Sequence, residues 1–177
     1  MADKTITKAR GDDSSPLAIC LENINKTFGS VQANRDVCLS VVPGTIHGIV
    51  GENGAGKSTL VSILYGFYSA DSGTVAISGE PVRLRSSADA IAAGIGMVHQ
   101  HFMLVPNFTV LENIILGHEG GSDLKAGARQ AEASLKSITE RYGLSVDLQA
   151  VVQDLPVGLQ QRVEILKALY RGARILI

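Results

Sequence analysis

Residues 51–59, which read GENGAGKST, combine the residue types that can hold a row of phosphate groups. Their spacing matches G-x-x-x-x-G-K-[ST], with Gly51 and Gly56 at the glycine positions, followed by Lys57 and Ser58. Glycines accept backbone angles that a Cβ forbids, so N–H groups can approach an anion closely. The lysine offers a positive charge to the outer phosphates, and the serine hydroxyl offers an oxygen to Mg²⁺. The residues we expect to contact a nucleotide here are Gly51, Glu52, Asn53, Gly54, Ala55, Gly56, Lys57, Ser58 and Thr59.

Two flanking elements must position this loop. Upstream, residues 45–50 form a short apolar run after the turn pair Pro43-Gly44, which predicts a buried strand. Downstream, apolar residues at 60, 63, 64 and 67 recur at helical spacing, so we expect a helix to begin near Gly56. The N-terminus of that helix would carry about half a positive charge and favour a phosphate. A strand, loop and helix in this order argue against a chance glycine-rich turn.

The rest of the chain alternates strand and helix patterns. We expect strands at 17–24, 37–42, 74–77 and 95–98, and helices at 86–93, 122–142 and 159–170. This order predicts an α/β fold with a mainly parallel core sheet and an antiparallel β piece beside it. Residues 1–16 are polar and predict a disordered tail, so the domain is expected to span residues 17–177. Because residues 173–177 begin an apolar strand with no turn after it, we expect a truncated domain.

The composition excludes several classes of function. The net charge is −1, from 16 basic and 17 acidic residues, which implies no general attraction to nucleic acid or anionic lipid. The sequence has neither an 18-residue apolar run nor a signal peptide, so we expect a cytosolic chain that meets membranes through a partner. Cys20 and Cys38 are too few for a zinc site and are expected to be small buried residues.

Three further segments carry a resemblance to a known family. Residues 155–168, LPVGLQQRVEILKA, resemble the signature region of ATP-binding cassette proteins, where L-S-G-G-Q precedes Q-Q-R-V. Residues 98–100 resemble the family's Q-loop and end in Gln100. Phe28 lies 23 residues before Gly51, where the family's adenine-stacking aromatic residue usually falls. Four motifs in order, over about residues 17–177, make chance agreement improbable. The matching signature positions are Leu155, Gly158, Gln160, Gln161, Arg162 and Val163.

The resemblance implies an ATP hydrolase with a P-loop NTPase-like core and a helical subdomain at about residues 101–160. In this family the Q-loop glutamine meets Mg²⁺, so Gln100 joins Lys57 as an expected catalytic residue and Ser58 as an expected metal ligand. The Asp-Glu pair that binds Mg²⁺ and polarises water would follow Ile177, so this segment is expected to hydrolyse ATP poorly alone. The signature residues, which cap the γ-phosphate held by another cassette, would be Leu155, Pro156, Val157, Gly158 and Leu159.

One position departs from the family pattern. Pro156 stands where the signature has serine, and proline has neither a hydroxyl nor a backbone N–H to donate. Val157 and Leu159 also replace the usual Gly and Gln. We therefore expect the nucleotide site of the partner cassette to be weak.

The sequence of residues 97–117 and 155–173 resembles that of the ATPase subunits of importers of nucleosides and simple sugars, which contain two cassettes in tandem. The resemblance implies transmembrane permease subunits and a second cassette as partners, with a solute-binding protein acting indirectly. It also implies a peripheral location on the cytoplasmic face of the cell membrane and no nucleic-acid partner. Two alternatives remain open: a cassette ATPase that acts on nucleic acid or ribosomes, and a hydrolysis-deficient nucleotide-binding fragment.

Overall fold

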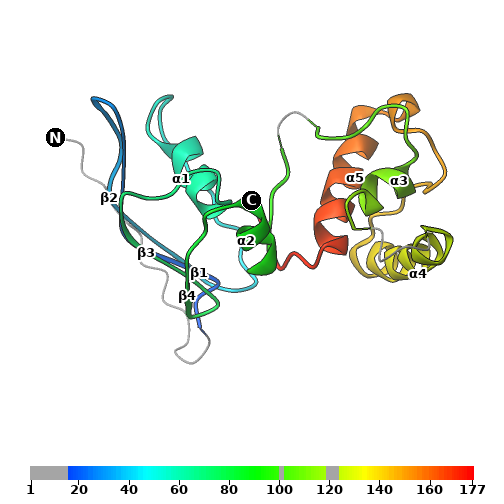
Figure 1. Cartoon of the computed structure of the whole chain (residues 1–177), viewed down its shortest axis with the longest axis horizontal. Helices are drawn as coiled ribbons and strands as arrows, with labels where there is room; N and C mark the ends of the chain where they lie inside the picture. The colour runs from blue at the N-terminus through cyan, green and yellow to red at the C-terminus, as the bar shows by residue number, and fades with distance from the viewer. Residues whose placement is uncertain (1–15, 100–101, 119–123) are drawn as a thin grey trace. The chain divides into compact units, whose positions relative to one another are not determined.

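The computed structural model describes residues 16–99, 102–118 and 124–177, which form two compact units (Figure 1). The described part of the first unit comprises residues 16–64 and 68–85, and the second comprises residues 65–67 and the described residues from 86 to 177. Residues 1–15 of the predicted tail lie outside the described residues, as does Gln100.

The first unit contains a four-stranded antiparallel sheet with the strand order β2-β1-β3-β4 (Figure 1). Ile19, Leu21 and Ile24 of β1 are buried, and helix α1 packs near β2. Gly29, with a φ of +57°, makes the tight turn between β1 and β2. The predicted strands at 17–24 and 37–42 are present but extend to this turn. The elements are β1 (Ile19–Phe28), β2 (Val31–Val41), α1 (Lys57–Leu64), β3 (Ser72–Ile77) and β4 (Glu80–Val82).

The strand predicted over residues 45–50 is wrong. These residues form no strand, and Ile46 and Val50 are fully exposed. A strand requires a neighbour that accepts and donates its backbone hydrogen bonds. The four strands of the first unit pair with one another, and none of the described residues forms a ladder with 45–50. An irregular segment therefore precedes the glycine-rich loop.

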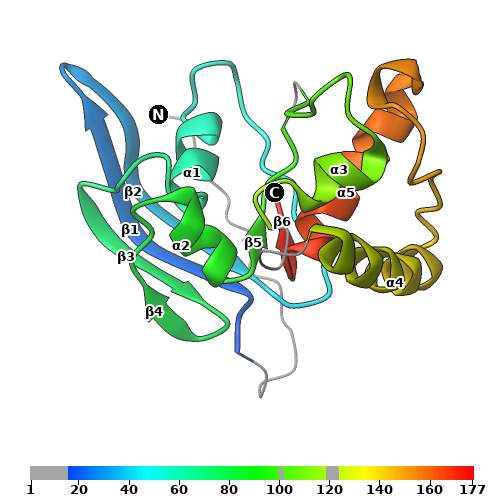
Figure 2. The same cartoon turned by 45° about the vertical axis from the view of Figure 1, so that its right-hand side comes forward.

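The second unit contains the parallel part of the fold and most of the helices. Strands β5 and β6 lie side by side and pair in parallel (Figure 2). Among the described residues this pair is the only parallel ladder, so the parallel sheet is smaller than the sequence predicted. The elements are α2 (Ser87–Ala92), β5 (Ile95–Gly96), α3 (Val110–Ile115), α4 (Leu124–Tyr142), the 3-10 helix η1 (Val152–Asp154), α5 (Val157–Tyr170) and β6 (Ile175–Leu176).

Helices α3, α4 and α5 share a hydrophobic core. Ala131 and Leu135 of α4 are buried, in agreement with the spacing that predicted this helix. Helix α5 begins two residues earlier than predicted and ends before Gly172, whose φ is +84°. The core residues are Val110, Leu111, Ile114, Ala131, Leu135, Val152, Val163 and Leu166.

Two local expectations need correction. Helix α3 was not predicted, although its N-terminus carries a capping box between Thr109 and Glu112. Cys38 is exposed and Cys20 is only partly buried, so the predicted burial is wrong for Cys38. Cys38 lies in the part of β2 where the pairing with β1 shifts register, and alternation therefore does not place it in the core.

Candidate nucleotide-binding site

The glycine-rich loop adopts the backbone conformation that its composition predicts. Gly54 and Gly56 both have a φ of +83°, a region that residues with a Cβ rarely adopt. Gly51 differs, because a Cβ there would make only an ordinary contact, 3.4 Å from the Cβ of Ala55. Residues 51–55 are all exposed to solvent. The loop therefore presents an open surface immediately before α1.

Lys57, the first residue of α1, folds its side chain back over the loop. Its Nζ donates hydrogen bonds to the carbonyl oxygens of Gly51 and Glu52, both at 2.8 Å. The Ala55 N–H also donates to the Glu52 carbonyl, at 3.1 Å, which tightens the turn. An ammonium has three N–H donors, and two of them are used here. The charge of Lys57 is thus held where a bound anion would meet both it and the loop.

Ser58 and Thr59 lie in the first turn of α1. Ser58 is exposed and Thr59 is partly buried. The first four N–H groups of a helix lack partners within the helix and carry the positive end of its dipole. The hydroxyl of Ser58 is therefore open to a ligand at the same end of the helix as the ammonium of Lys57.

Strand β2 supports the loop from behind. A Cβ on Gly56 would lie 2.1 Å from the Ala33 carbonyl oxygen and 2.8 Å from Asn34 Nδ2, so any other residue would force the backbone to shift. Asn34 is buried, with 4% of its surface exposed, and its Nδ2 donates to the Gly56 carbonyl at 3.2 Å. The loop and β2 therefore meet backbone to backbone.

Phe28 ends β1 in the same unit. The residue is 41% exposed, and its ring meets Tyr68 edge to face, with centroids 5.1 Å apart and planes at 71°. Phe28 pairs with Val31 across the turn, and the three strand steps from Val31 to Asn34 span roughly 10 Å. Phe28, the residue predicted to stack on the base, thus lies beside the first residue of β2. The loop contacts β2 further along the strand, at Asn34. Tyr68 was missed by the sequence reasoning.

A charged pair stands beside this aromatic ring. Lys26 Nζ lies 5.3 Å from the Phe28 ring centroid and forms an ion pair with Asp71 at 2.8 Å. The hydrogen bond from Lys26, and a second from the Thr27 N–H, lower the pKa of the Asp71 carboxyl below its ordinary value. The ion pair with Asp71 holds the Lys26 ammonium near the ring.

The signature-like residues form the N-terminus of α5 in the second unit. Pro156 is the N-cap and provides no side-chain hydrogen bond, as its type predicts. Val157 is 70% exposed, and a Cβ on Gly158 would have no neighbour within 4 Å. Leu159 N–H already donates to the Pro156 carbonyl at 2.8 Å. This helix end therefore offers exposed backbone at Val157 and Gly158, without a hydroxyl.

Gln100 itself is not among the described residues, but the segments on either side of it are. On the N-terminal side, Val98 N–H donates to the Ile177 carbonyl at 2.8 Å, which continues the parallel pairing of β5 with β6. On the C-terminal side, both backbone groups of Met103 are held by α5. Glu164 Oε1 accepts the Met103 N–H at 2.8 Å, and Lys167 Nζ donates to its carbonyl at 2.9 Å.

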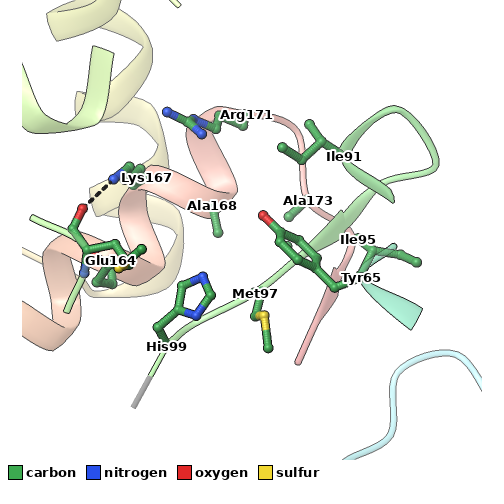
Figure 3. A pocket seen from close by; sticks show the side chains of 12 residues that line it. Tyr65, Ile91, Ile95, Met97, His99, Glu164, Lys167, Ala168, Arg171 and Ala173 are labelled. Carbon is green, nitrogen blue, oxygen red and sulfur yellow. Dashed lines mark hydrogen bonds between the residues drawn. The ribbon is translucent and has the colours of Figure 1, made fainter. Parts of the chain in front are cut away.

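Figure 3 shows Glu164 and Lys167 on α5 and Arg171 just after its last residue, with Tyr65, Met97 and His99 nearby. These residues line a cavity of about 150 Å³. Glu164 is buried, and burial lowers the pKa of the Lys167 ammonium despite the favourable charge of Glu164. The sequence reasoning missed this arrangement. Its signal is the spacing of charged residues 164, 167 and 171 beside the apolar residues 163 and 166.

Comparison with known proteins places these features in a wider context. A family model described as "ABC transporter" matches residues 34–177. A putative carbohydrate transport ATP-binding protein of Mycoplasma pneumoniae is 50% identical over 175 residues, covering 92% of this chain and 31% of that protein. The guanosine import ATP-binding protein NupO of Bacillus subtilis is 50% identical over 155 residues, covering 88% of this chain and 30% of that protein. The chain thus spans about a third of the length of these curated relatives.

Solved structures agree with these matches. A nucleotide-free ATP-binding cassette from an ABC transporter is similar with a TM-score of 0.76 and 28% identity, covering 92% of this chain and 68% of that one. The ADP form of an ATP-binding cassette is similar with a TM-score of 0.77 and 28% identity, covering 92% and 67% respectively. The predicted α/β fold class is confirmed by these likenesses, although few parallel strands are formed within the described residues.

Proposed function

The chain belongs to the ABC transporter family, and from this premise we propose that residues 51–59 bind the phosphates of Mg-ATP. The observation that carries the proposal is the pose of Lys57, whose ammonium bridges two carbonyls of the loop at 2.8 Å. A phosphate oxygen, which carries a full negative charge, is a stronger acceptor for this ammonium than a neutral carbonyl. When ATP binds, Lys57 exchanges one or both carbonyls for phosphate oxygens without moving away from the loop.

The other residues of this unit fit the remaining parts of the nucleotide. Exposed N–H groups of the loop and of the first turn of α1 face the phosphates, aided by the helix dipole. Phe28, exposed at the end of β1, offers a face for the adenine ring. Mg²⁺ prefers oxygen ligands, and in this unit the exposed Ser58 hydroxyl would supply one. When bound, the ion neutralises charge on the phosphate oxygens.

We further propose that the protein powers the import of a small solute, a nucleoside or a simple sugar. The support comes from its similarity to proteins named for the import of carbohydrate, guanosine and ribose. Lys57 would stabilise charge on the γ-phosphoryl group as water attacks in line. Residues 155–159 would face the nucleotide of a second cassette.

The proposed partners are a second cassette, transmembrane permease subunits and, indirectly, a solute-binding protein. No helix among the described residues is long and apolar enough to cross a bilayer. We place the protein on the cytoplasmic face of the membrane, where the permease would hold it. Co-purification of the chain with the permease from membranes, and its release without detergent when the permease is deleted, would support this location.

Isothermal titration with Mg-ATP tests the central proposal. Lys57→Ala removes the charged donor, and we expect an affinity roughly 10- to 100-fold lower, as for the loss of charge-assisted hydrogen bonds. Lys136→Ala, on an exposed part of α4, is the matched control and should bind as the parent chain does. Because Lys57 also holds two loop carbonyls, unfolding without nucleotide is measured for each variant. Equal ATP affinity in all three proteins would overturn the proposal.

A further inference from the structure

We propose that Asn34 is a positioning residue for the phosphate loop, because it fixes the peptide between Gly56 and Lys57 so that the Lys57 N–H faces the bound phosphates. The inference rests on the proposed function of residues 51–59. Asn34 lies on β2, outside the glycine-rich motif and 22 residues before Gly56. Nothing in the spacing of the motif requires an amide at this position.

The hydrogen bonds to the Gly56 carbonyl show how the peptide is held. Asn34 Nδ2 donates to this oxygen at 3.2 Å, and Leu60 N–H donates to it at 3.0 Å as the first bond of α1. A carbonyl oxygen has two lone pairs, and both are occupied by these donors. The oxygen is therefore directed away from the loop, towards β2 and the body of the helix.

Because the peptide bond is planar, the direction of the Gly56 carbonyl also fixes the direction of the Lys57 N–H. The Gly56 carbonyl and the Lys57 N–H belong to the same trans peptide, so they point in opposite directions. Holding the carbonyl against β2 directs the Lys57 N–H towards the loop, where no helical acceptor exists for it. This N–H lies at the positive end of α1, the position at which helices bind phosphate.

The backbone around Gly56 cannot relax to another arrangement easily. Gly56 has a φ of +83°, and the space where a Cβ would lie is filled by the Ala33 carbonyl oxygen. Asn34 is anchored by β2, where its strand neighbour in β1 is Lys26. The amide of Asn34 therefore acts from a fixed strand on a tightly packed peptide.

The second polar atom of Asn34 argues that the residue is not there for stability. Its Oδ1 is buried and has no hydrogen-bond partner among the described residues. An unpaired buried oxygen is unfavourable, and an apolar residue of similar volume would avoid it. Placing a donor at Gly56 is the one contact that an amide makes here and an apolar side chain cannot.

The test uses Asn34→Leu, which keeps the volume but removes the donor. We expect its free energy of unfolding without ligand to equal or exceed that of the parent chain. Its affinities for Mg-ATP and for tripolyphosphate should both fall about five-fold, the change produced by one net hydrogen bond. An equal loss of affinity for Mg-ATP and for tripolyphosphate would show that Asn34 acts on the binding of the phosphates. Gln32→Leu, exposed on the same strand, is the control and should leave both affinities unchanged.

A second measurement reads the peptide directly. In the parent chain the Lys57 amide resonance should move downfield when tripolyphosphate binds, and in Asn34→Leu this shift should be smaller. If Asn34→Leu does not fold, Asn34→Asp carries the test, because its carboxylate keeps the shape but cannot donate to a carbonyl. Its affinity should fall by more than five-fold, since it adds a negative charge near the phosphates.

The outcomes separate the two proposals. If the parent chain binds neither ligand, or if Lys57→Ala binds as well as the parent, the proposed function fails. In a second outcome, the parent binds and Lys57→Ala binds more weakly, so the proposed function stands. If the folded Asn34 variants then keep the parental affinity, and their Lys57 amide moves on tripolyphosphate binding as far as it does in the parent, only the role of Asn34 is overturned. Weaker binding of ATP with unchanged binding of tripolyphosphate would also overturn it.

Discussion

Gly54 and Gly56 provide a matched pair for testing how β2 supports the loop. Both have a φ of +83°, so an alanine at either position carries left-handed strain, on the order of 1 kcal/mol. The surroundings differ: a Cβ at Gly54 meets nothing within 4 Å, whereas at Gly56 it lies 2.1 Å from the Ala33 carbonyl oxygen. A carbon and an oxygen normally approach no closer than about 3.3 Å, so the backbone would have to shift by about 1.2 Å.

The expected costs follow from this difference. Gly54→Ala should lower the free energy of unfolding by about 1 kcal/mol, from strain alone. Gly56→Ala should cost a further 1–3 kcal/mol, roughly the penalty for forcing an extra carbon into a packed site. Because the obstacle is backbone rather than a flexible side chain, it cannot be avoided by a rotamer change.

The assay is denaturant unfolding of both variants and the parent chain, in the absence of nucleotide. Omitting nucleotide keeps the comparison independent of any change in phosphate binding. Equal losses of unfolding free energy in the two variants would refute the reasoning, since they would mean that β2 does not restrict the loop at Gly56. A larger loss for Gly54→Ala would refute it as well.

Three further predictions concern the second unit. Glu164→Ala should lower the free energy of unfolding by about 1–3 kcal/mol, because a backbone N–H loses its acceptor, while Glu164→Gln should lose less than half as much; equal losses in denaturant unfolding would contradict this. Thr109→Ala should destabilise by about 1 kcal/mol through loss of the cap. Hydrogen bonds from Thr109 lower the pKa of the Glu112 carboxyl below 4.5. The stability that this carboxylate adds is therefore complete above pH 4.5 and is lost as the pH falls through the lowered pKa. If Thr109→Ala left the acid-unfolding profile unchanged, this pH dependence would be disproved. Asn113→Leu should lower the free energy of unfolding in urea by roughly 2–4 kcal/mol, because the buried Asn113 amide holds both backbone groups of Val105. A loss as small as that expected for Asn34→Leu would show that these two hydrogen bonds do not stabilise the fold.

Local patterns predicted the helices well where they are long. The apolar spacing over residues 122–142 predicted α4, whose described part is Leu124–Tyr142, and Gly172 predicted the end of α5. Helix α3 was missed although α2, which has the same length of six residues, was predicted from the sequence. The Thr109 and Glu112 pair was the local signal that could have found it.

The run at residues 45–50 shows where local patterns fail. Its apolar composition resembles a buried strand, yet the segment is irregular and Ile46 is exposed. Helical hydrogen bonds join residues four apart, so a helix depends mainly on its own sequence, whereas a strand depends on a partner elsewhere in the chain. Composition can propose a strand but cannot supply that partner.

The sequence by itself determined the phosphate loop: its glycine spacing, the lysine and the start of α1 all act within a few residues of one another. Only the tertiary structure brought Asn34 and Ala33 against Gly56, and placed Tyr68 against Phe28. The contact with Gly56 arises because β2 folds back along β1 and passes behind the loop, and both contacts join residues more than twenty positions apart. No spacing rule encodes such a contact, since its geometry depends on the packing of the sheet.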